Sequence, residues 1–88
     1  MNKLNLKNKI LIIITKFKVN DFNSVIKTSN FLLRQFKNND FLWTLQGLSY
    51  LNLNNEVNSI KSFQTAIKIN PKNIDAKNYL GIAYKKIN

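Results

Sequence analysis

The sequence predicts an all-α protein of five helices, and three features of the chain indicate this. Its two glycines, Gly47 and Gly81, are each followed three residues later by a tyrosine. Their separation, called the repeat interval below, matches the period of about 34 residues that is typical of paired-helix repeats. The four acidic residues recur at spacings of 19, 16 and 19, and each opens an expected helix. The single proline, Pro71, separates two expected helices, because proline removes a backbone donor and restricts the residue before it.

These features place helices at about residues 4–18, 22–36, 40–53, 56–69 and 74–87. A carboxylate in the first turn satisfies free N–H groups and opposes the positive end of the helix dipole. The carboxylates in question are Asp21, Asp40, Glu56 and Asp75. Asn39, Asn55 and Asn73 precede three of them and can serve as the caps themselves. Basic residues favour the opposite ends, and those expected there are Lys16, Lys18, Arg34, Lys37, Lys68, Lys85 and Lys86.

The segment Ile10–Ile14 is the one whose secondary structure has two interpretations. Its run of β-branched residues suits a strand by propensity. The register of the repeat requires a helix there, and we therefore expect a helix.

Residues 40–84 resemble a tetratricopeptide repeat (TPR). The residues that carry the resemblance are Trp43, Gly47 and Tyr50, then Phe63 and Ala66, then Pro71, Gly81 and Tyr84. Gln46, Ser59 and Lys77 depart from the family pattern, which has leucine, alanine and a second tryptophan there. A helical glycine costs about 1 kcal/mol relative to alanine. In the family, such a glycine allows two helices to pack closely.

The resemblance implies an α-solenoid of antiparallel helix pairs, with two repeats plus the first helix of a third. Residues 1–88 would form one domain, with a divergent repeat at 6–39, a repeat at 40–73 and a half repeat at 74–88. In the second repeat we expect Val57, Ile60, Phe63, Ala66 and Ile67 to face Trp43, Gly47 and Tyr50. In the first, the second-helix residues expected inside are Phe22, Val25, Ile26, Leu32, Leu33 and Phe36.

Composition argues against catalysis. The chain has no cysteine and no histidine, which excludes disulfides and the ordinary zinc sites and removes the commonest general base. Its serines have no histidine to activate them. We expect no enzyme activity, no cofactor and no metal. The longest apolar run falls far short of the roughly 18 residues of a membrane span, so we expect a soluble, cytoplasmic protein with no membrane partner.

The charge of the chain, +10 with a pI near 10.1, would suit a nucleic-acid partner. However, 13 of the 14 basic residues are lysine, and the chain is rich in asparagine and isoleucine, so A+T-rich coding explains the charge without a partner. We expect neither nucleic acid nor a small molecule as ligand. Aromatic residues at helical spacing are expected in the core rather than as base-stacking platforms: Phe17, Phe22, Phe31, Phe36, Phe41 and Tyr79.

The resemblance also implies a binding surface, because in the family the first helix of each repeat lines an inner face that holds a peptide or a partner helix. The corresponding residues are Ile10, Ile14, Phe17, Phe41, Thr44, Leu48, Leu51, Asn78, Ile82 and Lys85. The middle of this stripe is apolar, which suits a hydrophobic peptide with acidic flanks and not a chaperone tail. Leu48 and Leu51 have a second interpretation, as packing residues between repeats.

Two functions remain open at this point. The first is a non-catalytic scaffold that binds a protein or peptide. The second is the leading repeat region of a larger enzyme, such as a glycosyltransferase or sulfotransferase, that presents substrate to a catalytic domain beyond residue 88. The last expected helix has few polar positions. We therefore expect the chain to be the N-terminal part of a longer protein, whose missing C-terminal region would contact that helix.

Overall fold

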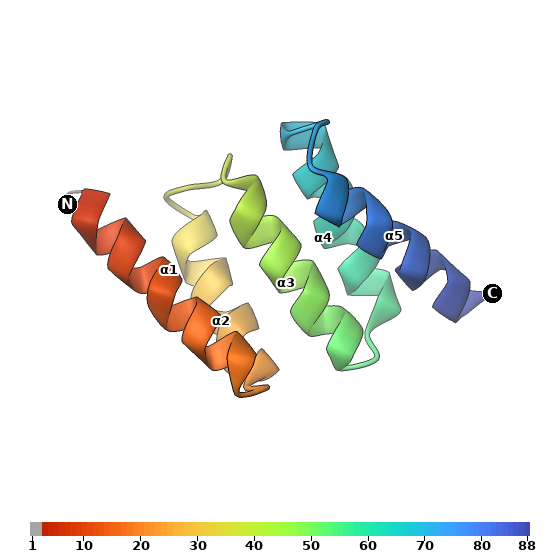
Figure 1. Cartoon of the computed structure of the whole chain (residues 1–88), viewed down its shortest axis with the longest axis horizontal. Coiled ribbons are helices and arrows are strands. Elements are labelled where there is room, and N and C mark those ends of the chain that lie inside the picture. The colour runs from red at the N-terminus through yellow and green to blue at the C-terminus, as the bar shows by residue number, and fades with distance from the viewer. Residues whose placement is uncertain (1–2) are drawn as a thin grey trace.

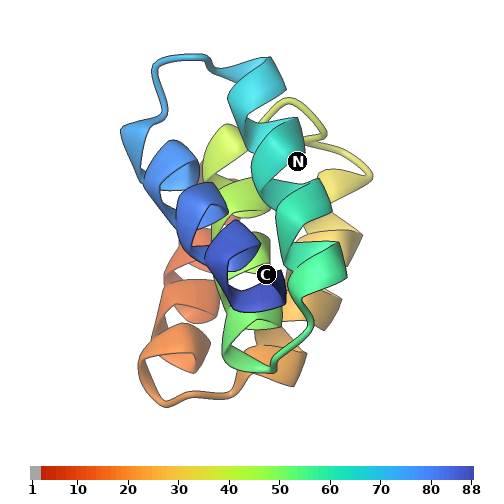
Figure 2. The same ribbon diagram turned by 90° about the vertical axis from the view of Figure 1, so that its right-hand side faces the viewer.

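Five α-helices follow one another along the chain and confirm the expected all-α class. They are α1 (Lys3–Lys18), α2 (Phe22–Leu33), α3 (Asp40–Asn52), α4 (Glu56–Ile69) and α5 (Ile74–Ile87). The computed structural model describes the backbone of residues 3–88 and the side chains of residues 6–88. Each helix packs against the next, and α3 also touches α5 (Figure 1). Seen from the end of the molecule, α1, α3 and α5 form one layer and α2 and α4 the other (Figure 2).

Consecutive helices run in opposite directions, and the start of α1 and the end of α5 lie at opposite ends of the longest dimension (Figure 1). The molecule measures 43 × 28 × 18 Å, with a radius of gyration of 12.4 Å. Within residues 3–88, no helix combines the length and the apolar character needed to cross a membrane.

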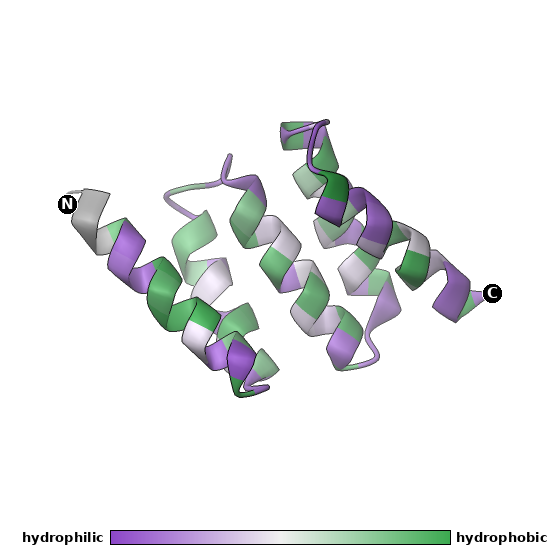
Figure 3. Cartoon of the chain, viewed as in Figure 1, coloured by the Kyte–Doolittle hydropathy of each residue, from purple (hydrophilic) through white to green (hydrophobic). Residues whose placement is uncertain are grey.

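The segment Ile10–Ile14 lies within α1, so the helical expectation is confirmed. The middle of α1 is a continuous hydrophobic stretch (Figure 3). Ile13 is fully buried, whereas Leu11 and Ile12 are more than half exposed. The helical period, which turns one residue in three or four toward the core, explains this division.

The second helix ends at Leu33, earlier than the expected residue 36. The N–H groups of Gln35 and Phe36 both donate to the carbonyl of Leu32, at 3.1 and 2.9 Å, and the chain then turns away. Nε1 of Trp43 donates to the carbonyl of Lys37 at 2.9 Å and holds the loop. Lys37 is therefore a loop residue, and the expectation that it lies at a helix end was wrong.

The turns after α1 and α3 share one geometry. Asn20 and Asn54 have φ angles of 63° and 60°, in the left-handed region that asparagine tolerates better than most residues. The N–H of the following residue reaches back five positions in both turns, from Asp21 to Lys16 and from Asn55 to Tyr50, each at 2.9 Å. The two turns are separated by the repeat interval, the same spacing that separates Gly47 from Gly81.

The N-caps recur at the same interval. The side chains of Asn39, Asn55 and Asn73 each accept a hydrogen bond from the backbone N–H three residues on, which confirms that these asparagines are caps. Asp21 caps α2 in the same way, accepting from the N–H of Ser24. Asp21 lies one repeat interval before Asn55, and Asn39 lies one repeat interval before Asn73.

The core consists of two clusters. The first contains Ile13, Val25, Leu32, Leu33, Leu42 and Leu45. The second contains Leu51, Phe63, Ala66, Ala76 and Ala83. Trp43 packs against both. Three residues expected inside lie outside: Val57 is 62% exposed, Phe31 57% and Phe41 44%.

Close packing at Gly47 is confirmed. A Cβ atom added there would lie 2.5 Å from Cε1 and 2.7 Å from Cδ1 of Phe63, so only glycine admits the ring in this position. The residues one repeat interval earlier are Ile13 and Ser29, both fully buried. The first helix pair therefore has the large residue on α1 and the small one on α2, and the second pair has the reverse.

Gln46, where the family pattern has leucine, joins three helices. Its Nε2 donates to Oγ of Ser29 at 3.0 Å and to Oδ1 of Asn30 at 2.7 Å, and its Oε1 accepts from Oγ of Ser62 at 3.2 Å. Gln46, Ser29 and Ser62 are all buried. Buried polar groups are tolerated when they are hydrogen-bonded, and no buried side-chain N or O among residues 6–88 lacks a partner.

Candidate functional site

The ten residues of the expected binding surface occupy three different environments. Ile10, Ile14 and Phe17 are half-buried; they pack against the first core cluster. Thr44 and Leu51 are buried, and Leu48 is half-buried against the second cluster. Phe41, Asn78, Ile82 and Lys85 are exposed.

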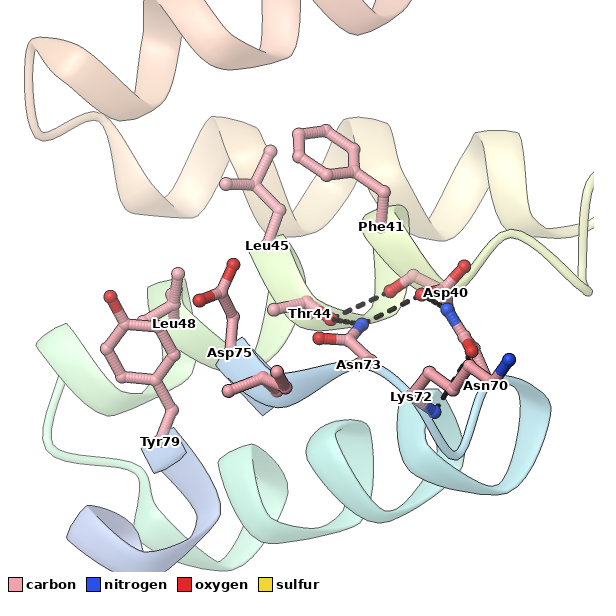
Figure 4. A pocket seen from close by; sticks show the side chains of 11 residues that line it. Asp40, Phe41, Thr44, Leu45, Leu48, Asn70, Lys72, Asn73, Asp75 and Tyr79 are labelled. Carbon is pink, nitrogen blue, oxygen red and sulfur yellow. Dashed lines mark hydrogen bonds between the residues drawn. The ribbon is translucent and has the colours of Figure 1, made fainter. Parts of the chain in front are cut away.

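Three of the ten, Phe41, Thr44 and Leu48, line a hollow between α3 and the start of α5 (Figure 4). Its volume is about 680 Å³. The remaining lining residues are Asp40 and Leu45 of α3, Asn70, Lys72 and Asn73 of the connecting loop, and Ile74, Asp75 and Tyr79 of α5. The other seven expected residues lie outside this hollow.

One end of the hollow is held by side-chain hydrogen bonds. Oδ2 of Asp40 accepts from Nδ2 of Asn70 at 3.1 Å and from Nδ2 of Asn73 at 2.8 Å. The same amide of Asn73 donates to Oγ1 of Thr44 at 2.9 Å, and that hydroxyl donates to the carbonyl of Asp40 at 2.8 Å. The loop before α5 is thereby fixed to the first turn of α3, and these bonds shape one end of the hollow.

The wall of the hollow is mixed in character. Phe41 and Leu48 supply apolar surface from α3, and the side chains of Asp75 and Tyr79 stand near Leu48 from α5 (Figure 4). Aromatic rings and a carboxylate together suit a side chain that has an apolar stem or carries a positive charge. The hollow is thus chemically suited to a group of that kind.

A second hollow lies beside α1. Leu6, Lys7, Ile10 and Leu11 line it with Phe36, and its volume is about 500 Å³. Ile10 is the only residue of the expected surface that lines it. Its wall is almost wholly apolar, and it is separate from the hollow between α3 and α5.

Sequence reasoning placed Tyr79 in the core and missed it as a neighbour of Leu48 in this hollow. Asp75 stands one repeat interval after Phe41, so its place in the wall agrees with the periodicity of the sequence. Among the described residues, no three or more histidine, cysteine, aspartate or glutamate side chains gather where they could hold a metal ion.

Comparison with known proteins adds no relative: no family model matches this chain, and no curated protein matches it. The class that the fold defines is an all-α protein of five helices packed in sequence, with a hollow between α3 and the start of α5.

Proposed function

We propose that the chain is a non-catalytic protein-interaction module of the tetratricopeptide type, an α-solenoid of antiparallel helix pairs. Two features support the proposal. The turn geometry at Asn20 and Asn54 and the caps of the helices recur at the repeat interval, which is the period of that family. Gly47 also receives the ring of Phe63, which gives the characteristic glycine its packing partner.

The proposed ligand is a peptide or a partner helix bound along the layer of α1, α3 and α5. The observation that carries this proposal is the hollow of about 680 Å³ between α3 and α5. It is lined by Phe41 and Leu48, which the family resemblance placed on the inner face, and it is shaped by the bonds of Asp40, Asn73 and Thr44. A preformed concave site with an apolar wall and a few fixed polar groups is the usual form of a ligand site.

The experiment is a selection of peptides from a displayed library against the intact chain, followed by titration of the selected peptides. Phe41→Ala removes an exposed wall of the hollow, and Phe31→Ala removes a similarly exposed ring from α2, so the two variants form a matched pair. We expect selected peptides to bind Phe41→Ala at least ten-fold more weakly and to bind Phe31→Ala normally. Chemical-shift changes should concentrate at Thr44, Leu48 and Tyr79. Equal affinity for both variants would contradict the proposed site.

A further inference from the structure

The side of α5 that carries Gly81 is largely exposed. A Cβ atom added at Gly81 would meet nothing within 4 Å. Tyr84 is 40% exposed and Ile87 51%. At the inner edge of this face, Leu80 packs against the second core cluster, and Oη of Tyr84 accepts a hydrogen bond from Nε2 of Gln64 at 2.9 Å. The i, i+1, i+4, i+7 spacing of one helix face is followed by Leu80, Gly81, Tyr84 and Ile87. In Figure 2, α5 and α4 form the end of the molecule that faces the viewer, and no other element lies in front of them.

The chain itself shows what covers such a face. The four residues of the α5 face stand one repeat interval after Gln46, Gly47 and Tyr50 of α3 and Leu53, its C-cap. On α3, the space above Gly47 is filled by the ring of Phe63. The helix that supplies the ring, α4, buries small residues beside it, namely Ser59, Ser62 and Ala66. The occupant that fits the equivalent face of α5 is therefore a helix with one aromatic ring among small residues.

The size exchange between the helix pairs supports a ring in particular. Where the first-helix residue is the large Ile13, the second helix has the small Ser29, and where it is Gly47, the second helix has Phe63. Gly81 lies one repeat interval after Gly47 and is small in the same way, so a large residue is expected opposite it. Glycine destabilises a helix relative to alanine, and no described residue uses the open space at Gly81.

Charge identifies the partner further. Lys77 and Lys85 lie one turn before and one turn after Gly81, on the same side of α5. A second copy of this chain would bring another net charge of +10 to the contact, and like charges oppose association. An acidic helix would instead be attracted to these lysines.

We propose that the face of α5 formed by Leu80, Gly81, Tyr84 and Ile87 docks an acidic amphipathic helix of another protein, with a phenylalanine ring of that helix seated on Gly81. None of these four residues lines the hollow between α3 and α5. The proposal therefore stands or falls separately from the peptide site.

The probe is a synthetic copy of α4, residues 56–69, which already has the required ring and small residues. An i, i+4 crosslink between positions 57 and 61, both exposed in α4, holds the short peptide helical. The substitutions Gln64→Glu and Lys68→Glu make it acidic. Two control peptides are matched to it: one also carries Phe63→Ala, and the other carries Gln64→Lys and retains Lys68.

Titration against the intact chain should show binding of the acidic peptide, at least ten-fold weaker binding of the Phe63→Ala peptide, and weaker binding of the lysine peptide. On the chain, Gly81→Leu should lower the affinity at least ten-fold by filling the seat of the ring. The matched control is Asn23→Leu, at an exposed position of α2, which should leave the affinity unchanged. The melting temperature of Gly81→Leu should equal or exceed that of the wild type, because leucine favours a helix more than glycine does.

Three results would overturn the proposal. One is an acidic peptide that does not bind, and another is binding that Gly81→Leu leaves unaltered. The third is self-association of the chain alone, lost in Gly81→Leu on sedimentation, which would assign the face to a second copy.

Discussion

The side-chain amide of Asn73 lies 2.8 Å from Oδ2 of Asp40, so the residue that caps α5 is bonded to the first residue of α3. The other end of the same side chain accepts from the N–H of Ala76 at 2.9 Å. Asn73 therefore stabilises its own helix and positions that helix against α3. The hollow between the two helices depends on both bonds.

Replacing Asn73 with alanine should lower the free energy of unfolding by about 1–3 kcal/mol, because it removes a cap and two side-chain bonds. Asn55→Ala removes a cap bond of the same kind, to the N–H of Asn58, and should cost about 1 kcal/mol. Urea unfolding of the two variants measures the difference. Equal losses would show that the bonds to Asp40 and Thr44 contribute little.

The two glycines should respond to alanine with opposite signs. At Gly47 the new methyl group meets the buried ring of Phe63, and overpacking costs about 1–3 kcal/mol, of which helix propensity offsets about 1 kcal/mol. At Gly81 the methyl group meets open space, so the variant should gain up to about 1 kcal/mol and melt about 4–8 °C higher. Thermal unfolding by circular dichroism checks both. A rise in melting temperature at Gly47 would contradict the close approach of the ring.

Substitution of Gln46 tests the buried bonds among three helices. Gln46→Leu introduces the leucine of the tetratricopeptide pattern but removes the acceptor of the buried Ser62 hydroxyl, and we expect a loss of about 1–3 kcal/mol. Adding Ser62→Ala removes the unpaired hydroxyl, so the double variant should be more stable than the sum of the two single changes predicts. A double-mutant cycle in urea measures the coupling. Simple additivity would argue against the bond.

Replacing Asn54 with glycine should preserve stability better than replacing it with alanine. Its φ of 60° costs an ordinary side chain about 1–2 kcal/mol, so Asn54→Ala should be destabilised by about 1 kcal/mol. Asn54→Gly should be neutral or slightly more stable. The same pair of changes at Asn20, with its φ of 63°, is the internal control. Loss of stability with glycine at both sites would mean that the asparagine side chains themselves hold these turns.

Much of the fold follows from local signals. The caps Asn39, Asn55 and Asn73 could be predicted because a cap interacts with its own first turn, and α3, α4 and α5 followed from them and from Pro71. The prediction of α1 depended on the repeat interval instead. The end of α2 could not be predicted from the sequence, because Phe36 continues the apolar pattern and no glycine or proline marks Leu33 as the last helical residue. Val57 and Phe31 fit the helical period but are more than half exposed, and Nζ of Lys9 from α1 lies over the Phe31 ring at 5.9 Å from its centroid.

The site was only partly predictable. Phe41, Thr44 and Leu48 came from the family resemblance and the repeat interval, and they line one hollow. The bond of Asp40 to Asn73 depends on the path of the loop through Asn70, which no periodicity encodes. Residues 6–39 match the repeat pattern only weakly, because Ile13 and Ser29 stand where the second helix pair has Gly47 and Phe63. All four positions are buried.

The exchange of sizes at these four positions makes the two helix pairs non-interchangeable. If α4 were to pair with α1, the ring of Phe63 would meet Ile13, and if α2 were to take the place of α4 beside Gly47, Ser29 would leave a void there. One arrangement overfills its interface and the other leaves a cavity, and each fault costs about 1 kcal/mol or more. Correct pairing of the helices therefore depends on side-chain volume as well as on chain connectivity. A folding chain that pairs the wrong helices forms a less stable state than one that pairs the right helices.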